Sequence, residues 1–251
     1  MKKIILSSIL IGTMFSTLNA DFIRVETGGG VTSTETIGNL NVFGEHINID
    51  DTAGFSKNEN LYLWGRIKHP VPILPNFQLE YSESNNKGDI TNDITILGNT
   101  YPSGVSNELN LKDIDAIMYY NVLDNTFWMT FDFGLDVKFI DAEYKVKSNI
   151  SGVEDYDYSD SVILPLGYVR GRVQVPFVNL AADGNIKYIA YQNNSLIDAS
   201  LKVEYTMDFV PIVQPLIEVG YRYKKYDLDS GFDVGMELEY SGPFVGIGAK
   251  F

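Results

Sequence analysis

The sequence predicts an all-β fold, a transmembrane antiparallel up-and-down β-barrel of ten strands with eight strands as the alternative. Three observations predict it. From Phe127 to Phe139 every second residue is large and apolar, which is the period of a β-strand and leaves no helical interpretation. Compact, apolar, proline-bearing turns alternate along the chain with long, polar, acidic loops. The end of the chain, Gly242 to Phe251, is a strand pattern that stops on an aromatic residue.

The N-terminus predicts a secretory signal peptide over residues 1–20, so that the mature barrel domain spans residues 21–251. A basic start, Met1-Lys2-Lys3, precedes an apolar core from Ile4 to Phe15, and Ala20 is the small residue at the expected cut. Leu18 is bulkier than the usual residue at its place before the cut. The cleavage site is therefore less well defined than the signal itself.

Composition and charge exclude several classes of protein. The 251 residues are 45% hydrophobic and 13% aromatic, which suits one large all-β domain. Without the signal peptide, 17 basic and 33 acidic residues remain, a net charge of −16 that disfavours nucleic acid as a partner. The absence of cysteine excludes a lipoprotein anchor and a disulfide scaffold. After Ala20 the longest uncharged run, Ile94 to Asn107, is too polar for a transmembrane helix, so only a closed barrel could cross a bilayer.

The first strand is expected from Phe22 to about Thr32, with Gly28-Gly29-Gly30 inside it. Glycines in a strand mark a bend or a close backbone approach. Two interpretations stay open: this strand curves against the glycine-bearing last strand where the barrel closes, or the glycines are a flexible strand end. A phosphate-binding loop is not expected, because no helix pattern follows. The polar segment Ser33–Asn60 is expected to be a long loop.

The middle of the chain alternates strands with turns and loops. The strongest strand, from Phe127 to Phe139, exceeds the roughly 9–11 residues that a membrane-spanning strand needs, and its alternation continues through Ala142, Tyr144 and Val146. It is long enough to cross a membrane and stand above it. The elements expected before it are strand 61–68, the proline-rich turn His69–Asn76, strand 77–82, the loop Glu83–Asn107 with a small hairpin at Ile94–Leu97, strand 109–121 and the turn Val122–Asn125. Those after it are the acidic loop Ser148–Asp160 and the strands Val162–Val175, Leu180–Tyr191, Leu196–Tyr205, Pro215–Tyr226 and Phe232–Phe251.

The two classes of connection indicate the orientation. If the first strand leaves the periplasm, the apolar turns all fall on the periplasmic side and the acidic loops fall outside, as in outer-membrane barrels. The mature chain resembles the small outer-membrane β-barrels of Gram-negative bacteria, in particular the uncharacterised family named for a Gly-Gly pair in its first strand. The stretches that carry the resemblance are Gly28-Gly29-Gly30, the turn His69–Asn76, the hairpin Tyr119–Asn125 and the end Gly242–Phe251. The resemblance implies a place in the cell outer membrane, and it assigns no chemistry.

The last strand also resembles the closing strand that the outer-membrane assembly machinery reads. Gly246, Ala249 and Phe251 are the candidate assembly signal on that resemblance. Outer-membrane lipid, lipopolysaccharide and the assembly machinery are the expected partners. The sequence names no external ligand.

The candidate site is the barrel lumen, which the polar face of each strand would line. Nine bases and eight acids nearly cancel there, which predicts a charge-paired and closed lumen. The bases are Arg24, Arg66, Lys68, Lys138, Arg170, Arg172, Lys202, Arg222 and Lys224, and the acids are Glu26, Glu80, Asp115, Asp132, Asp136, Asp198, Glu204 and Glu218. The alternative is a small ion- or solute-conducting pore lined by Arg170, Arg172, Arg222 and Lys224. A periplasmic lipid-binding β-protein, with its apolar face inward, is a third interpretation.

No enzyme and no cofactor are expected. His46 falls in the first external loop and His69 at a periplasmic turn, so the two histidines would stand a bilayer apart. The acidic cluster Asp155, Asp157 and Asp160 is a weak candidate for a Ca²⁺ site, because it lacks the glycine and the distant glutamate of a calcium loop. A solvated acidic loop is the preferred interpretation of that cluster.

Overall fold

The computed structural model describes residues 23–42, 45–55, 58–71, 73–148, 152–208, 212–228 and 234–251. The predicted signal peptide lies outside them, as do Phe22 and Phe232 at the expected starts of the first and last strands. Within the described residues no helix is long and apolar enough to cross a membrane.

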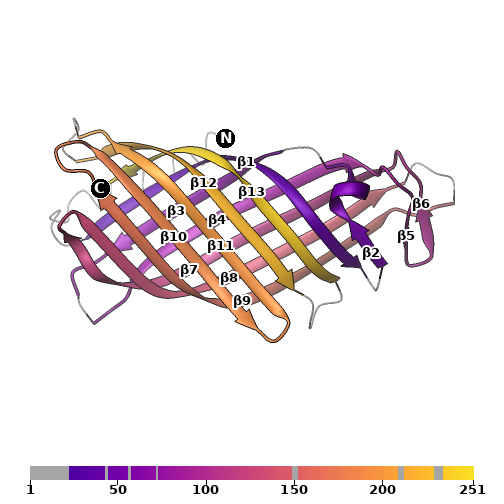
Figure 1. Ribbon diagram of the computed structural model, residues 1–251, viewed down its shortest axis with the longest axis horizontal. Coiled ribbons are helices and arrows are strands. Elements are labelled where there is room, and N and C mark those ends of the chain that lie inside the picture. Colours follow the sequence, from indigo (N-terminus) through magenta and orange to yellow (C-terminus); the bar gives the residue numbers. More distant parts are fainter. Residues whose placement is uncertain are drawn as a thin grey trace.

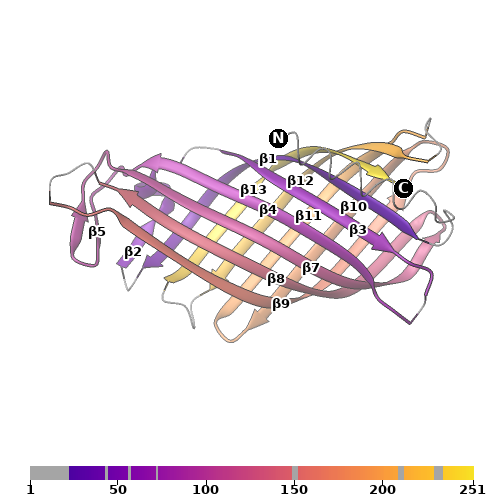
Figure 2. The ribbon, with the colours of Figure 1, turned by 180° about the vertical axis from the view of Figure 1, so that it is seen from behind.

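Ten long strands form the wall of a closed antiparallel barrel, as predicted, and the eight-strand alternative is wrong. Each strand pairs with its neighbour in sequence and β13 pairs with β1, which closes the cylinder seen in Figures 1 and 2. The wall strands are β1 (Arg24–Val42), β3 (Asn58–Lys68), β4 (Asn76–Asp89), β7 (Ser106–Thr126), β8 (Met129–Lys147), β9 (Tyr156–Gln174), β10 (Leu180–Tyr191), β11 (Asn194–Thr206), β12 (Gln214–Leu228) and β13 (Val234–Lys250). The additional elements are β2 (Glu45–Asn48), a single π-helical turn η1 (Ile49–Ala53) and the hairpin β5 (Ile94–Ile96) with β6 (Asn99–Tyr101).

Partway along the strands, the apolar side chains change from the outer face of the barrel to the inner face. The upper end of the barrel is the end that carries β2, η1, β5 and β6, at the right of Figure 1, and the lower end is the opposite one. On the part of β8 below Ile140, the outward side chains are apolar and the inward ones, such as Lys138, are polar. Above that point the inward side chains, such as Tyr144, are apolar, while Asp141 faces outward and is exposed. Lipid therefore surrounds the lower part of the strand and water surrounds the upper part, because each solvent selects the side chains that face it.

On the neighbouring strands the apolar side chains change faces at the same height along the barrel. Asp141 of β8 is in register with Lys112 of β7 and with Ser161 of β9, and all three side chains are exposed on the outside. Below this row the outward residues of β9, such as Ile163 and Val169, are apolar and exposed. The row marks the outer limit of the lipid-facing band, and the barrel wall continues above it.

The expected external loops are therefore shorter than the sequence indicated. The predicted loop Ser33–Asn60 contains the upper half of β1, then β2 and η1, and β3 already begins at Asn58. The predicted loop Glu83–Asn107 loses its first residues to β4, and the loop Ser148–Asp160 loses its last residues to β9. These stretches look like loops because their outward side chains are polar, yet they are strand segments that stand in water. The small hairpin predicted at Ile94–Leu97 is present, but it extends to Tyr101.

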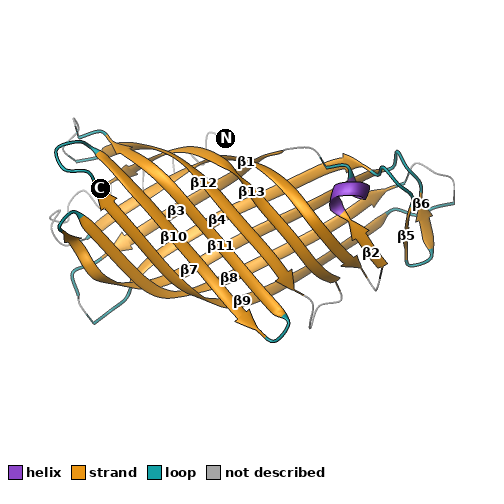
Figure 3. Cartoon of the chain, in the orientation of Figure 1, coloured by secondary structure: helices purple, strands orange, loops and turns teal. Residues whose placement is uncertain are grey.

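The connections at the upper end fold over the barrel and bury an apolar cluster, the apolar cap. In Figure 3 the helical turn and β2 lie beside the upper wall, with β5 and β6 beyond them. The Asn107 amide donates to the Ala53 carbonyl at 2.8 Å, and the Tyr101 hydroxyl donates to the Glu154 carbonyl at 3.1 Å, so separate connections are tied together. The fully buried members contributed by these connections are Ile47, Ile49, Ala53, Ile90, Ile96 and Tyr101.

The lower end carries short connections, at 69–75, 127–128, 175–179 and 207–213. The turn predicted at Val122–Asn125 is misplaced, since β7 runs on to Thr126 through register irregularities. Phe127 and Trp128 form the turn, both with positive φ. Short connections face the periplasm in outer-membrane barrels, which gives the barrel its orientation.

The first and last strands close the barrel through their glycines. Gly28 and Gly30 of β1 pair with Gly248 and Gly246 of β13, so the interpretation in which the glycine-bearing strands meet is correct. Phe251 extends the seam, because its amide donates to the Val25 carbonyl at 2.8 Å.

Candidate functional site: the barrel lumen

The candidate site begins with the residues that the strand period turns inward below the cap. They form two charged layers. The lower network lies toward the short turns and comprises Glu26, Arg66, Asp132, Arg170, Arg172, Asp183, Lys202, Glu204, Glu218 and Lys250. The middle network lies between it and the cap and comprises Glu80, Asp113, Asp115, Asp136, Lys138, Lys187, Asp198, Arg222 and Lys224.

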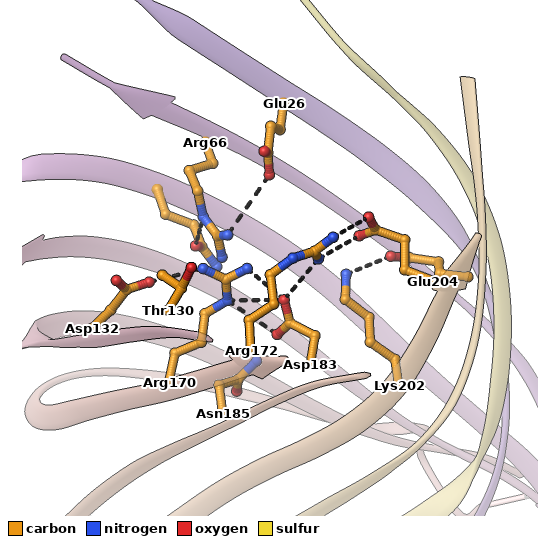
Figure 4. Close-up of polar contacts among 12 residues, drawn as sticks. Glu26, Arg66, Thr130, Asp132, Arg170, Arg172, Asp183, Asn185, Lys202 and Glu204 are labelled. Carbon is orange, nitrogen blue, oxygen red and sulfur yellow. Dashed lines mark hydrogen bonds and ion pairs between the residues drawn. The ribbon is translucent and has the colours of Figure 1, made fainter. Parts of the chain in front are cut away.

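Arg170 is the centre of the lower network (Figure 4). Its Nη1 donates to Asp132 at 2.8 Å, and its Nε donates to both carboxylate oxygens of Asp183 at 3.0 Å. Asp132 and Asp183 come from the strands on either side, β8 and β10. Arg170 is in register with Asp132 on β8, and on β10 Asp183 lies two residues from the residue in register with Arg170. All three side chains are buried, so this arginine ties three adjacent strands together inside the barrel.

The remaining members of the lower network continue the ring. Arg172 holds Glu204 through two guanidinium nitrogens, at 2.8 and 3.1 Å. Glu218 of β12 accepts from the Tyr62 hydroxyl of β3 at 2.7 Å across the lumen, and it pairs with Lys202 of the neighbouring strand β11 at 2.5 Å. Lys250 of the last strand also pairs with Glu204. The inner side of the layer leaves little space for solvent, since the cavity there has a volume of about 30 Å³.

Two buried lysines organise the middle network. Lys138 lies 2.6 Å from Asp115 and 3.2 Å from Asp198, and Lys187 lies 2.7 Å from Glu80 and 3.4 Å from Asp198. Both lysines are fully buried. Charges removed from water in this way are costly unless paired, and the carboxylate partners of the two lysines come from three strands, β4, β7 and β11. The middle network therefore crosses the lumen and fills it.

The structure corrects the predicted membership of the lumen. Asp113, Asp183, Lys187 and Lys250 belong to it and were missed, although each lies on the inward phase of its strand. Within the described chain, Asp136 has no hydrogen-bond donor at either carboxylate oxygen, so it is a member without a matched cation. Arg24 lies at the rim with its side chain half exposed, and Lys68 pairs with Asp124 of the lower end.

The acidic candidates for a calcium site do not converge. Asp157 faces outward on β9 and lies 3.8 Å from Lys145, whereas Asp160 faces inward on the same strand. Asp155 accepts from the Ser148 amide at 2.8 Å. Opposite faces of one strand cannot present ligands to one ion, so this cluster is not a metal site. Among the described residues no group of His, Asp or Glu side chains is placed to hold a metal.

The apolar cap above the lumen is neutral. Burial raises the pKa of the Tyr101 and Tyr144 hydroxyls, and it raises the pKa of Tyr156 to about 12. These groups remain uncharged at any physiological pH. The lumen thus carries networks of ion pairs in its lower two layers and is apolar at its outer end.

The outer surface of the lower barrel is a continuous apolar band. Its exposed side chains include Leu63, Leu79, Leu135, Leu201 and Ile247, one from each of five different strands. Val245, Ile247, Ala249 and Phe251 of the last strand point outward as predicted, opposite Gly246, Gly248 and Lys250. Exposure of this extent is expected against lipid and not against water. A soluble lipid-binding protein would need these side chains turned inward, so that interpretation is wrong.

Comparison with solved structures finds similar chains. The outer membrane protease OmpT from Escherichia coli is 11% identical over 93% of this chain and 97% of its own, with a TM-score of 0.50. The translocator domain of the autotransporter NalP from Neisseria meningitidis is 15% identical over 100% of this chain and 96% of its own, with a TM-score of 0.45. No protein-family model and no curated protein matches the chain. Likeness at this identity concerns the fold alone.

A closed barrel with a polar interior, an apolar outer band and short turns at one end defines an integral outer-membrane β-barrel. Its place is the outer membrane of a Gram-negative bacterium.

Proposed function

We propose that this barrel is a closed, non-enzymatic outer-membrane protein with a structural or surface-binding role. The observation that supports the proposal is the continuous filling of its interior, in which two charged networks are followed by the apolar cap. Lys138 and Lys187 are fully buried in the middle of the lumen and hold carboxylates of several strands. An aqueous path through that layer would require several buried ion pairs to separate at once.

The face available for binding is then the outside of the upper wall. It carries acidic side chains such as Asp141 and Glu239 next to bases such as Lys112, immediately above the lipid-facing band. Lipopolysaccharide is the partner proposed for this belt, since its phosphates and bridging cations would lie at that height. The narrower resemblance to the Gly-Gly family is supported by the place of Gly28 and Gly30 at the closing seam, and it adds no chemistry.

The closed lumen has a direct electrical test. Purified barrel inserted into planar bilayers is expected to show no discrete openings at any salt concentration, because ion pairs fill the lumen below the cap. A variant in which the hairpin of residues 92–103 is replaced by a short glycine linker is the matched control. This variant removes part of the cap and leaves both networks, so it should also show no discrete openings.

The runner-up function is a small channel, and the same measurement separates the two. Steady openings in the wild type, with a selectivity that changes when Arg170, Arg172 and Arg222 are replaced by alanine, would establish the pore. Openings confined to the hairpin variant would show that the cap, and not the charged networks, closes the barrel. Either result contradicts the proposal as stated.

We also propose that Phe251, with Gly246 and Ala249, forms the signal read by the outer-membrane assembly machinery. Deleting Phe251 is expected to lower the amount of folded barrel in outer-membrane fractions severalfold and to raise periplasmic degradation. Phe127→Ala is the matched control, since it removes an aromatic ring that is 79% exposed at a turn and should cost little. Immunoblots of fractionated cells measure both, and equal amounts of wild type and the Phe251 deletion would refute the assignment.

A further inference from the structure

The lower mouth of the lumen contains a cavity of about 110 Å³, larger than those of about 30 to 40 Å³ deeper in the barrel. On this scale about 10–15 Å³ already accommodates one water molecule, so a small polyatomic ion fits. Five cations and two carboxylates are among the side chains that line it: Arg24, Arg66, Lys68, Arg170 and Arg172, with Glu26 and Asp124. The cavity faces the periplasm in the orientation given by the turns.

The carboxylates that neutralise two of these arginines are not part of the cavity wall. Asp183 and Glu204 pair with Arg170 and Arg172 from deeper in the barrel, and neither lines the cavity. The two wall carboxylates are themselves engaged, Glu26 by Arg24 at 2.8 Å and Asp124 by Lys68. The cavity therefore presents mainly N–H donors to its interior.

Arg66 has donors to spare. Its Nε donates to the Gln78 amide oxygen at 2.7 Å, while the nearest carboxylate, that of Glu26, lies 3.8 Å from Nη1. Within the described chain neither Nη nitrogen of Arg66 makes a hydrogen bond. The guanidinium is held in place over the Tyr119 ring, 5.6 Å from its centroid. A fixed guanidinium with two free nitrogens is suited to a forked contact with an oxyanion.

A second guanidinium faces the same space. Figure 4 shows Arg66 next to Arg170, and the two groups are close enough to repel each other electrostatically. An anion between them would offset that repulsion. Thr130 reaches the same cavity from β8 and adds a hydroxyl.

We propose that this cavity binds a phosphate group, with Arg66 as its principal contact, Arg170 as the second guanidinium facing it and Arg24 at the rim. A phosphate group has more acceptor oxygens and more negative charge than a carboxylate, and its oxygens can accept forked hydrogen bonds from several guanidinium groups. The site lies inside the barrel wall and beneath the middle network, so a free phosphate or small phosphate ester can enter from the periplasm. This goes beyond the closed-lumen proposal, since a mouth site can be occupied whether or not the barrel conducts.

Calorimetric titration of the folded barrel in a neutral detergent with inorganic phosphate tests the site. Saturable binding in the millimolar range or tighter is expected, and Arg66→Gln should weaken it by about tenfold or more. Arg66→Lys keeps the charge and loses the forked geometry, so an intermediate loss is expected. Lys202→Gln is the control, because it removes one lumen cation that does not line the cavity.

A second variant protects the test against misfolding. Thr130→Tyr should fill the cavity while every arginine remains, so phosphate binding should disappear although the barrel still shows its heat-dependent gel shift. Repeating the titration in nanodiscs of phosphatidylglycerol separates the two sources of phosphate: competition by the lipid would assign the site to a headgroup, and unchanged affinity assigns it to a soluble anion. Absence of saturable binding, or equal losses in Arg66→Gln and Lys202→Gln, would overturn the proposal.

Discussion

Replacing Arg170 by alanine is expected to destabilise the folded barrel by about 3–5 kcal/mol, because it leaves buried carboxylates without their cation. Asp132 is affected most. It is fully buried, and without Arg170 only the Asn121 amide still donates to it among the described residues. Asp183 retains Arg172 at 3.3 Å. The free energy of unfolding in urea, with the barrel in phospholipid vesicles, is the quantity to measure.

The double variant Arg170→Ala with Asp132→Asn distinguishes unpaired charge from lost packing. Removing the abandoned carboxylate should recover most of the lost stability, since a buried pair replaced as a whole costs far less than a pair broken on one side. Arg24→Ala is the surface control. The Arg24 side chain is 53% exposed, so its pair with Glu26 should contribute about 1 kcal/mol or less. If the double variant is as unstable as Arg170→Ala, the buried charge of Asp132 is not the cause.

The strand pattern made most of the wall predictable. β10 begins and ends at the expected residues, Leu180 and Tyr191. Its outward side chains face lipid, and its pairing with β9 and β11 fixes which side chains point outward. On β8 the apolar alternation through Ala142, Tyr144 and Val146 was predicted as a continuation of the earlier one. It lies on the opposite phase, and that one-residue change is the sequence signal that the strand leaves lipid and enters water.

The lumen members missed from the sequence have a local cause. Asp183 stands in Asp183-Gly184-Asn185, a run that is typical of turns, and Lys187 is the second residue after it. Ile186 and Tyr188 point outward, and only this alternation shows that Asp183 and Lys187 face the interior. The apolar cap was beyond a local analysis, because isolated residues such as Ile49 and Ile96 meet only through contacts between distant connections.

The closing seam gives the second large effect. An alanine at Gly30 would place its Cβ on the Val245 carbonyl oxygen and the Gly246 Cα of the paired strand, far inside van der Waals contact. Both neighbours are backbone, so β1 and β13 must separate for the methyl group to fit. The small gain from a less flexible unfolded chain, about 0.4–1 kcal/mol, cannot offset a clash of this kind, which costs about 1–3 kcal/mol or more.

Gly30→Ala is therefore expected to prevent closure, so that the band with the mobility of folded barrel disappears from unheated gels and the chain is degraded in the periplasm. Gly171→Ala is the matched control, because a Cβ at that position on β9 meets nothing within 4 Å. The same substitution in two strands of one barrel isolates the seam from any general effect of losing a glycine. The C-terminal Phe251 is intact in both variants, so failure of Gly30→Ala alone would identify the contact between the first and last strands as the step that limits assembly. Normal folding of both would show that the seam can widen to accept a methyl group.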